Sequence, residues 1–191
     1  MKSFSKFLLG LFGWKADPDA PQLEKYVLIG APHTSNWDFP LTLLGLSSMG
    51  VRFNWVAKHT LFRWPFGYVL KAIGGIPVDR SAGTTFLKNT IELYEKRSRL
   101  ILAIAPEGTR SRSRYWKTGF YTIAMKAGVP IALGSIDYTK KQISIGRVLQ
   151  PSGNLEQDFQ IIQDFYLDKT GKYPENQGEI RIKASRKNQR A

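Results

Sequence analysis

Short apolar runs of strand length alternate with longer helical patterns along the chain, and this alternation limits the folds open to it. The run YVLIGA, for example, looks like a buried strand. Strands that alternate with helices predict an α/β sheet with helices on its faces. We expect strands at residues 26–31, 53–58, 76–79, 100–105, 131–138 and 142–149. We expect helices at residues 2–13, 37–49, 65–73, 84–97, 118–127 and 155–168.

Two local signals refine this architecture. The strands at 131–138 and 142–149 are joined through Thr139-Lys140-Lys141, which predicts a hairpin and therefore a mixed sheet. Asn154 followed by Gln157 offers a capping box for the last helix. A chain of 191 residues with 42% hydrophobic content fits one globular domain. We therefore predict a single α/β domain with a mixed, mostly parallel central sheet flanked by helices.

The composition favours an anionic partner and excludes sites that need cysteine. The 28 basic and 15 acidic residues leave a net charge of +13, which attracts nucleic acid, anionic lipid or an acidic carrier protein. The absence of cysteine excludes disulfides, thiolate metal sites and a cysteine nucleophile. No run approaches the roughly 18 to 20 apolar residues of a membrane-spanning helix, so we expect none.

Both ends of the chain, and one internal stretch, leave two interpretations open. The N-terminal residues form either an interfacial amphipathic segment or a helix that packs on the core; its apolar face comprises Phe4, Phe7, Leu8, Leu11 and Phe12. The missing cleavage pattern argues against a signal peptide. The aromatic stretch HTLFRWPFGYVL suits either a bilayer interface or ordinary packing. We divide the chain into an interfacial segment (1–20), a main domain (21–175) and a basic tail (176–191), which is either solvated or held to anionic lipid.

The segment PHTSNWD follows the first long strand and carries a histidine five positions before an aspartate. A neutral imidazole can accept a proton near pH 7, and it needs a partner that fixes its tautomer. A carboxylate at Asp38, in the first turn of the next helix, could curl back to His33. The alternative is that Asp38 only caps that helix and His33 is incidental, because H-x-x-x-x-D alone is a weak motif.

Two further strand ends carry groups suited to an anion. After LILAIA comes Glu107-Gly108-Thr109-Arg110, in which glycine allows backbone amides to approach, threonine adds a hydroxyl and arginine a bidentate fork for phosphate. The segment GGIPVDRS places Arg80 at the end of another short strand.

With these three segments, the sequence resembles the glycerolipid acyltransferases, the lysophosphatidate (1-acylglycerol-3-phosphate) acyltransferase family. Position 32 is proline, where many members carry asparagine. Lys58 with Leu61-Phe62 is similar to the family's lead-in to its second block. The resemblance rests on four blocks in the family's order: 33–38 (H-x-x-x-x-D), 75–80 (GIPVDR), 106–111 (PEGTRS) and 129–131 (VPI).

The resemblance implies acyl transfer from acyl-CoA or acyl-carrier protein to a hydroxyl of a lysophospholipid, in phospholipid biosynthesis. By this analogy His33 is the general base and Asp38 orients it. The implied substrate-binding residues are Arg80, Glu107, Gly108, Thr109 and Arg110: Arg110, Gly108 and Thr109 would hold the phosphate with help from Arg80, and Glu107 would order the loop. No metal and no bound cofactor are expected. Peripheral contact with anionic membrane on its cytoplasmic face, without a transmembrane helix, completes the prediction.

Three alternatives remain. The acceptor could be another lysolipid or an aminolipid. A basic nucleic-acid-binding or lipid-binding protein without catalysis would fit the charge, but nucleic-acid binding leaves His33 and Asp38 unexplained, no standard nucleic-acid motif is present, and no nucleic acid is expected. A serine hydrolase would need a nucleophile elbow, and G-x-S-x-G is absent.

Overall fold

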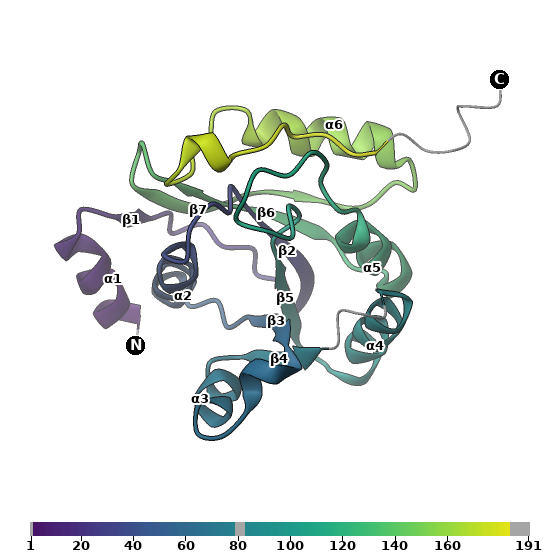
Figure 1. Cartoon of the computed structure of the whole chain (residues 1–191), viewed down its shortest axis with the longest axis horizontal. Coiled ribbons are helices and arrows are strands. Elements are labelled where there is room, and N and C mark those ends of the chain that lie inside the picture. The colour runs from purple at the N-terminus through teal and green to yellow at the C-terminus, as the bar shows by residue number, and fades with distance from the viewer. Residues whose placement is uncertain (1, 79–82, 184–191) are drawn as a thin grey trace.

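The computed structural model describes residues 2–78 and 83–183. Within this part of the chain, seven strands form one sheet in the order β1-β7-β6-β2-β5-β3-β4 (Figure 1). Neighbouring strands run parallel, apart from the antiparallel pair β6 and β7. The predicted α/β class, with a mixed and mostly parallel sheet, is confirmed.

The strands are β1 (Lys15–Ala16), β2 (Lys25–Ala31), β3 (Asn54–Lys58), β4 (Gly75–Val78), β5 (Leu100–Ile104), β6 (Ile131–Asp137) and β7 (Gln142–Leu149). The α-helices are α1 (Lys2–Leu11), α2 (Asp38–Met49), α3 (Phe66–Ala72), α4 (Gly83–Lys96), α5 (Gly119–Ala127) and α6 (Leu155–Tyr166). Two 3-10 turns, η1 (His59–Phe62) and η2 (Pro174–Asn176), complete the described elements.

Helices cover both faces of the sheet, because its central strands are apolar on both sides. In β2, Val27 and Ile29 pack into the core beneath α5 and α6, whereas Tyr26 and Leu28 pack into a second core with α1 and α2. This alternation is the period of two expected for a strand. Figure 1 shows α4, α5 and α6 on one side of the sheet and α1 and α2 on the other.

The predicted strands and helices are all present, with ends that shift by a few residues. The hairpin is confirmed, and Asn154 caps α6 by accepting a 3.2 Å hydrogen bond from the Gln157 backbone N–H. Asp79, the predicted end of one strand, lies outside the described residues. Strand β1 was not expected from the sequence, because its two residues form a strand only by pairing with β7.

The N-terminal helix packs on the core with one side and exposes apolar side chains on the other. Ser5 and Leu9 are buried where α1 packs on α2, so the core-packing alternative holds for that side. Four large apolar side chains of the N-terminal segment remain exposed: Phe4, Phe7, Leu11 and Phe12. A second exposed apolar set lies around η1 and α3: Leu61, Trp64, Phe66, Tyr68 and Val69. Among the described residues, no helix has both the length and the apolar character needed to cross a bilayer.

Candidate active site

Candidate site residues from three separate segments meet where the parallel strands end. Strand β2 lies between β5 and β6, with Ile29 opposite Ile104 of β5 and Ala31 opposite Ser135 of β6. The three strands run parallel, so the loops that follow them leave from one edge of the sheet. Crevices at the carboxyl ends of such strands are the usual binding places in open α/β sheets.

His33 and Asp38 form a hydrogen-bonded pair at this edge. The His33 Nδ1 atom lies 3.0 Å from Asp38 Oδ2. An ionised carboxylate can only accept, so in the neutral imidazole Nδ1 carries the proton and Nε2 carries the lone pair. The Asp38 side chain is 3% exposed and that of His33 is 27% exposed, so the imidazole lies between the buried carboxylate and solvent.

The intervening loop fixes the carboxylate. Oδ2 of Asp38 also accepts hydrogen bonds from the backbone N–H groups of Thr34 and Ser35, each at 2.9 Å. Asp38 is the first residue of α2, where the positive end of the helix dipole favours its negative charge. The five-residue spacing therefore places the aspartate so that it binds its own loop and the histidine together.

The other carboxylate oxygen of Asp38 is bound from a different strand. The Tyr138 hydroxyl, just beyond the end of β6, donates a 2.8 Å hydrogen bond to Oδ1. Sequence reasoning missed Tyr138. The available signal was its place after a buried strand, at the same edge that was expected to collect the site.

Glu107 links the PEGTRS loop to the histidine loop. Its Oε2 accepts a 2.9 Å hydrogen bond from the His33 backbone N–H. The Glu107 residue is 6% exposed, and burial raises the pKa of its carboxyl to about 7, against the smaller opposing effect of the hydrogen bond from His33. Two blocks of the sequence that lie 74 residues apart are thus joined by a buried carboxyl.

Three of the remaining predicted binding residues follow Glu107 in the same loop and are exposed to solvent. Gly108 adopts a positive φ of 69°, and a side chain there would meet Lys117, whose Nζ would lie 2.7 Å from the added Cβ. Thr109 Oγ1 accepts a 3.2 Å hydrogen bond from the Ser111 backbone N–H. The Arg110 side chain is exposed. Arg80 lies outside the described residues.

A C-terminal segment packs over both loops, and it was not foreseen as part of the site. The Tyr173 backbone N–H donates to Thr34 Oγ1 at 3.1 Å. The Trp116 backbone N–H donates to the Arg181 carbonyl at 2.8 Å. Residues 171–182, part of which we had grouped with a basic tail, therefore support the loops that carry His33 and Glu107.

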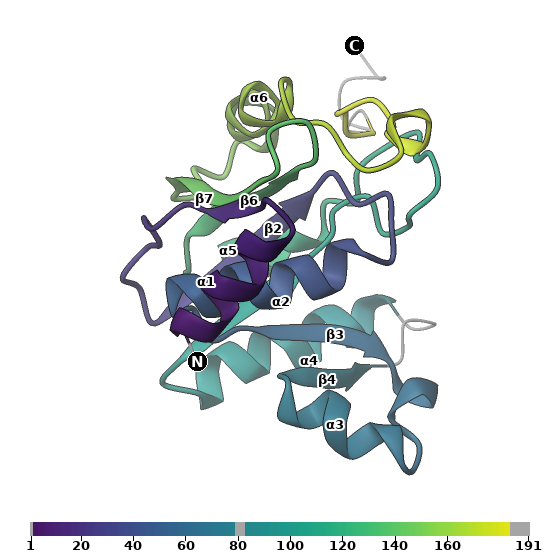
Figure 2. The same cartoon turned by 90° about the vertical axis from the view of Figure 1, so that its left-hand side faces the viewer.

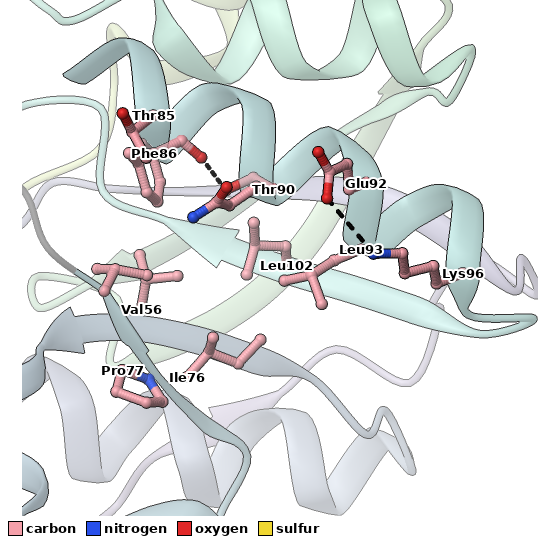
Figure 3. Close-up of a pocket in the computed structure, with 12 residues that line it drawn as sticks. Val56, Ile76, Pro77, Thr85, Phe86, Thr90, Glu92, Leu93, Lys96 and Leu102 are labelled. Carbon is pink, nitrogen blue, oxygen red and sulfur yellow. Dashed lines mark hydrogen bonds and ion pairs between the residues drawn. The ribbon is translucent and has the colours of Figure 1, made fainter. Parts of the chain in front are cut away.

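An apolar groove lies between α4 and strands β3, β4 and β5 (Figure 3). It has a volume of about 310 Å³, and Val56, Ile76, Phe86 and Leu102 line much of it. Figure 3 shows the side chains of α4 above this groove and those of the strands below it. Within the described residues, no cluster of three or more acidic or histidine side chains is placed to hold a metal ion.

Comparisons with known proteins agree with this arrangement. The 1-acyl-sn-glycerol-3-phosphate acyltransferase of Escherichia coli (strain K12) is 31% identical over 150 residues, which cover 74% of this chain and 60% of that protein. The enzyme of the same name from Haemophilus influenzae is 31% identical over 151 residues, covering 73% and 61%. The chain therefore spans about three-fifths of these relatives.

A solved structure and a family model extend the comparison. The crystal structure of the 1-acyl-sn-glycerophosphate acyltransferase PlsC from Thermotoga maritima superposes with a TM-score of 0.61 at 20% identity, covering 86% of this chain and 74% of that one. That likeness establishes a shared fold. The Acyltransferase family model matches residues 17–133, which contain all four sequence blocks. The resemblance predicted from those blocks is confirmed: the chain belongs to the acyltransferase family.

Proposed function

We propose that this protein transfers a fatty acyl group from a thioester, acyl-CoA or acyl-carrier protein, to a hydroxyl of a lysophospholipid such as 1-acylglycerol-3-phosphate. The observation that carries the proposal is the pair His33–Asp38, in which the carboxylate binds Nδ1 and leaves the Nε2 lone pair for a substrate. The names of the E. coli and H. influenzae relatives support this acceptor class.

The proposed reaction is a direct transfer. His33 Nε2 takes the proton of the acceptor hydroxyl as the hydroxyl oxygen attacks the thioester carbonyl carbon. The carbon–sulfur bond then breaks, and the departing thiolate takes that proton from the imidazolium. Asp38 stabilises the imidazolium while it exists, because its ionised oxygen lies 3.0 Å from Nδ1. No acyl-enzyme, metal or bound cofactor takes part.

The substrate-binding roles follow from the second loop. We assign the acceptor phosphate to Arg110, with Gly108 and Thr109, because these exposed residues directly follow Glu107, which is bound to the His33 backbone. Arg80 assists in this proposal. Glu107 is buried, so it orders the two loops and does not contact substrate. The apolar groove beneath α4 offers a place for an acyl chain (Figure 3).

We also propose that the protein binds an anionic membrane peripherally, on the cytoplasmic face. Two exposed apolar surfaces support this: one on α1 and the residue after it (Phe4, Phe7, Leu11 and Phe12), and one around α3 that includes Trp64 and Phe66. In Figure 2, α1 faces the viewer and α3 lies below it, beneath β4. The net charge of +13 favours an anionic surface.

The test is release of free thiol from acyl-CoA and from acyl-carrier protein, each offered with a panel of lysophospholipids and aminolipids. Release that depends on a phosphate-bearing lysophospholipid supports the proposal and names both substrates. Release only with another acceptor would move the enzyme to the alternative acceptor class. Release that is the same without any acceptor would mean hydrolysis and would contradict the proposal.

A further inference from the structure

Tyr138 is the one described side chain that binds Asp38 from outside the histidine loop and its helix. Oδ2 of Asp38 receives Nδ1 of His33 and two backbone N–H groups, whereas Oδ1 receives only the Tyr138 hydroxyl among the described residues. The site therefore joins the ends of two neighbouring strands, because the hydroxyl follows β6 and the carboxylate starts α2, the helix after β2.

We propose that Tyr138 is a positioning residue for acyl transfer: its hydroxyl holds the plane of the Asp38 carboxylate so that Oδ2 faces His33. The expected effect on catalysis rests on the proposed function. The geometry of Tyr138 and Asp38 is independent of that function.

The tyrosine is itself held firmly. Its ring lies edge-on to Trp14, with ring centroids 4.9 Å apart and planes at 88°. Its backbone N–H donates a 2.9 Å hydrogen bond to the Thr170 carbonyl. Side chain and backbone are thus fixed by two different segments of the chain, so the hydroxyl has a defined position before any substrate binds.

The hydroxyl also stays protonated. Burial, followed by the hydrogen bond to Asp38, raises the pKa of Tyr138 well above the range in which enzymes are assayed. It is therefore a neutral donor across the working pH range. A neutral donor on Oδ1 restrains rotation of the carboxylate and draws some negative charge away from Oδ2.

Loss of the hydroxyl has two expected effects. The carboxylate plane loosens, which misorients the imidazole and lowers kcat. The carboxylate also concentrates its charge on Oδ2, which stabilises the protonated imidazole and makes His33 titrate at higher pH. His33 must be neutral to accept a proton, so activity falls off at a higher pH in the variant.

Other ionisable groups lie near these residues and stay unchanged in this comparison. Glu107, from the loop after β5, binds the His33 backbone and has a pKa raised to about 7 by burial. Tyr173, from the C-terminal segment, lies close enough to influence Tyr138 electrostatically. Lys172 lies over the Trp37 ring, with Nζ 5.4 Å from its centroid. A difference between wild type and a Tyr138 variant therefore reports the hydroxyl.

The chain offers a matched control for Tyr138→Phe. Tyr121 donates a 2.7 Å hydrogen bond to buried Asp158, so Tyr121→Phe removes the same kind of tyrosine–aspartate bond between α5 and α6. The protein has two histidines, so proton NMR follows His33 through a pH titration with exposed His59 as an internal reference. Urea unfolding checks that both variants fold.

We expect Tyr138→Phe to lower kcat by roughly tenfold, the loss of about one hydrogen bond to a charged group. Relative to wild type, we expect the His33 NMR titration curve and the acid limb of kcat/KM to move to higher pH, with KM and His59 unchanged. Tyr121→Phe should show neither effect. Equal kcat and equal His33 titration in the two variants would overturn the inference. Failure of wild type to release thiol with any acceptor would instead refute the proposed function, since the NMR comparison needs no substrate.

Discussion

At the scale of single residues, the site contains two buried carboxyl groups, Asp38 and Glu107, which have different contacts. Asp38 accepts hydrogen bonds from two backbone N–H groups and the Tyr138 hydroxyl, and it pairs with the His33 ring. Glu107 receives only the His33 backbone N–H among its described contacts, and burial dominates, so its pKa rises to about 7. Asp38 therefore holds the His33 ring, and Glu107 joins two loops.

Glu107→Gln should change how stability depends on pH. The folded carboxyl stays protonated up to about pH 7, whereas in the unfolded chain it ionises near 4.5. Raising the pH between these values therefore releases a proton only from the unfolded state, which lowers the free energy of unfolding. We expect the wild type to lose up to about 3 kcal/mol relative to the variant over this window. Urea unfolding of both proteins at several pH values measures it, and parallel pH profiles would show that Glu107 has no such shift.

Arg110→Ala should act on acceptor binding. Loss of a charge-assisted hydrogen bond to phosphate is worth about 1.5 to 3 kcal/mol, so KM for a phosphate-bearing acceptor should rise by roughly 10- to 100-fold with kcat little changed. Arg147→Ala removes the same charge from an exposed position on β7 and should leave KM as it is. An unchanged KM in Arg110→Ala would place the phosphate site elsewhere.

At the scale of elements, features set by neighbouring residues could be predicted from the sequence. Contacts between distant segments could not. The hairpin and the Asn154 cap are set by neighbouring residues, and the structure confirms both. The His33–Asp38 contact was also predictable, because five residues and one turn determine it. Tyr138 lies 100 residues from Asp38, and the order of strands in the sheet, which the chain order does not state, brings them together.

The C-terminal segment shows the same limit. Its contact with the histidine loop requires Gly171, since a Cβ there would lie 2.7 Å from Thr34 Oγ1 and 3.2 Å from Pro32 Cβ. No local pattern marks that glycine as a packing position. The domain boundary drawn from composition therefore could not anticipate which residues near the C-terminus support the site.

Gly171→Ala should disturb the site through this packing. Forcing a methyl group into a filled space typically costs about 1 to 3 kcal/mol of stability, and here the strain falls on the loop that carries His33. We expect a lower urea midpoint and a several-fold lower kcat. Gly10→Ala is the control, because a Cβ at Gly10 would meet nothing within 4 Å. Full activity and stability in Gly171→Ala would show that residues 171–182 can shift to accept the methyl group without loss of stability, and would contradict this prediction.

At the scale of the whole molecule, the charge and the exposed apolar surface both suit the proposed contact with an anionic membrane. The net charge of +13 and the exposed face of α1 combine the electrostatic and hydrophobic parts of binding to an anionic bilayer. The α1 helix lies on the side of the sheet opposite α6 (Figure 1). Membrane contact should therefore depend on one side of the protein.

Phe7→Glu combined with Phe12→Glu should weaken sedimentation with anionic vesicles. Both side chains are more than 60% exposed, so the fold should tolerate the change. Binding by the wild type should also fall as salt is raised, because ions screen surface charge. Leu167→Glu, at an equally exposed position beside α6, is compared with Phe12→Glu alone and so controls for one added acid. Equal loss in the control, or binding that ignores salt, would contradict a specific α1 contact with anionic lipid.

The central claim is that His33 removes the acceptor proton, and one comparison tests it most directly. Acceptor-dependent thiol release should be measured for wild type and His33→Ala at saturating thioester, with urea unfolding to confirm that both are folded. We predict that the variant loses roughly 10²- to 10⁴-fold in rate, the usual contribution of a positioned general base. Release by a folded His33→Ala protein at close to the wild-type rate would contradict it.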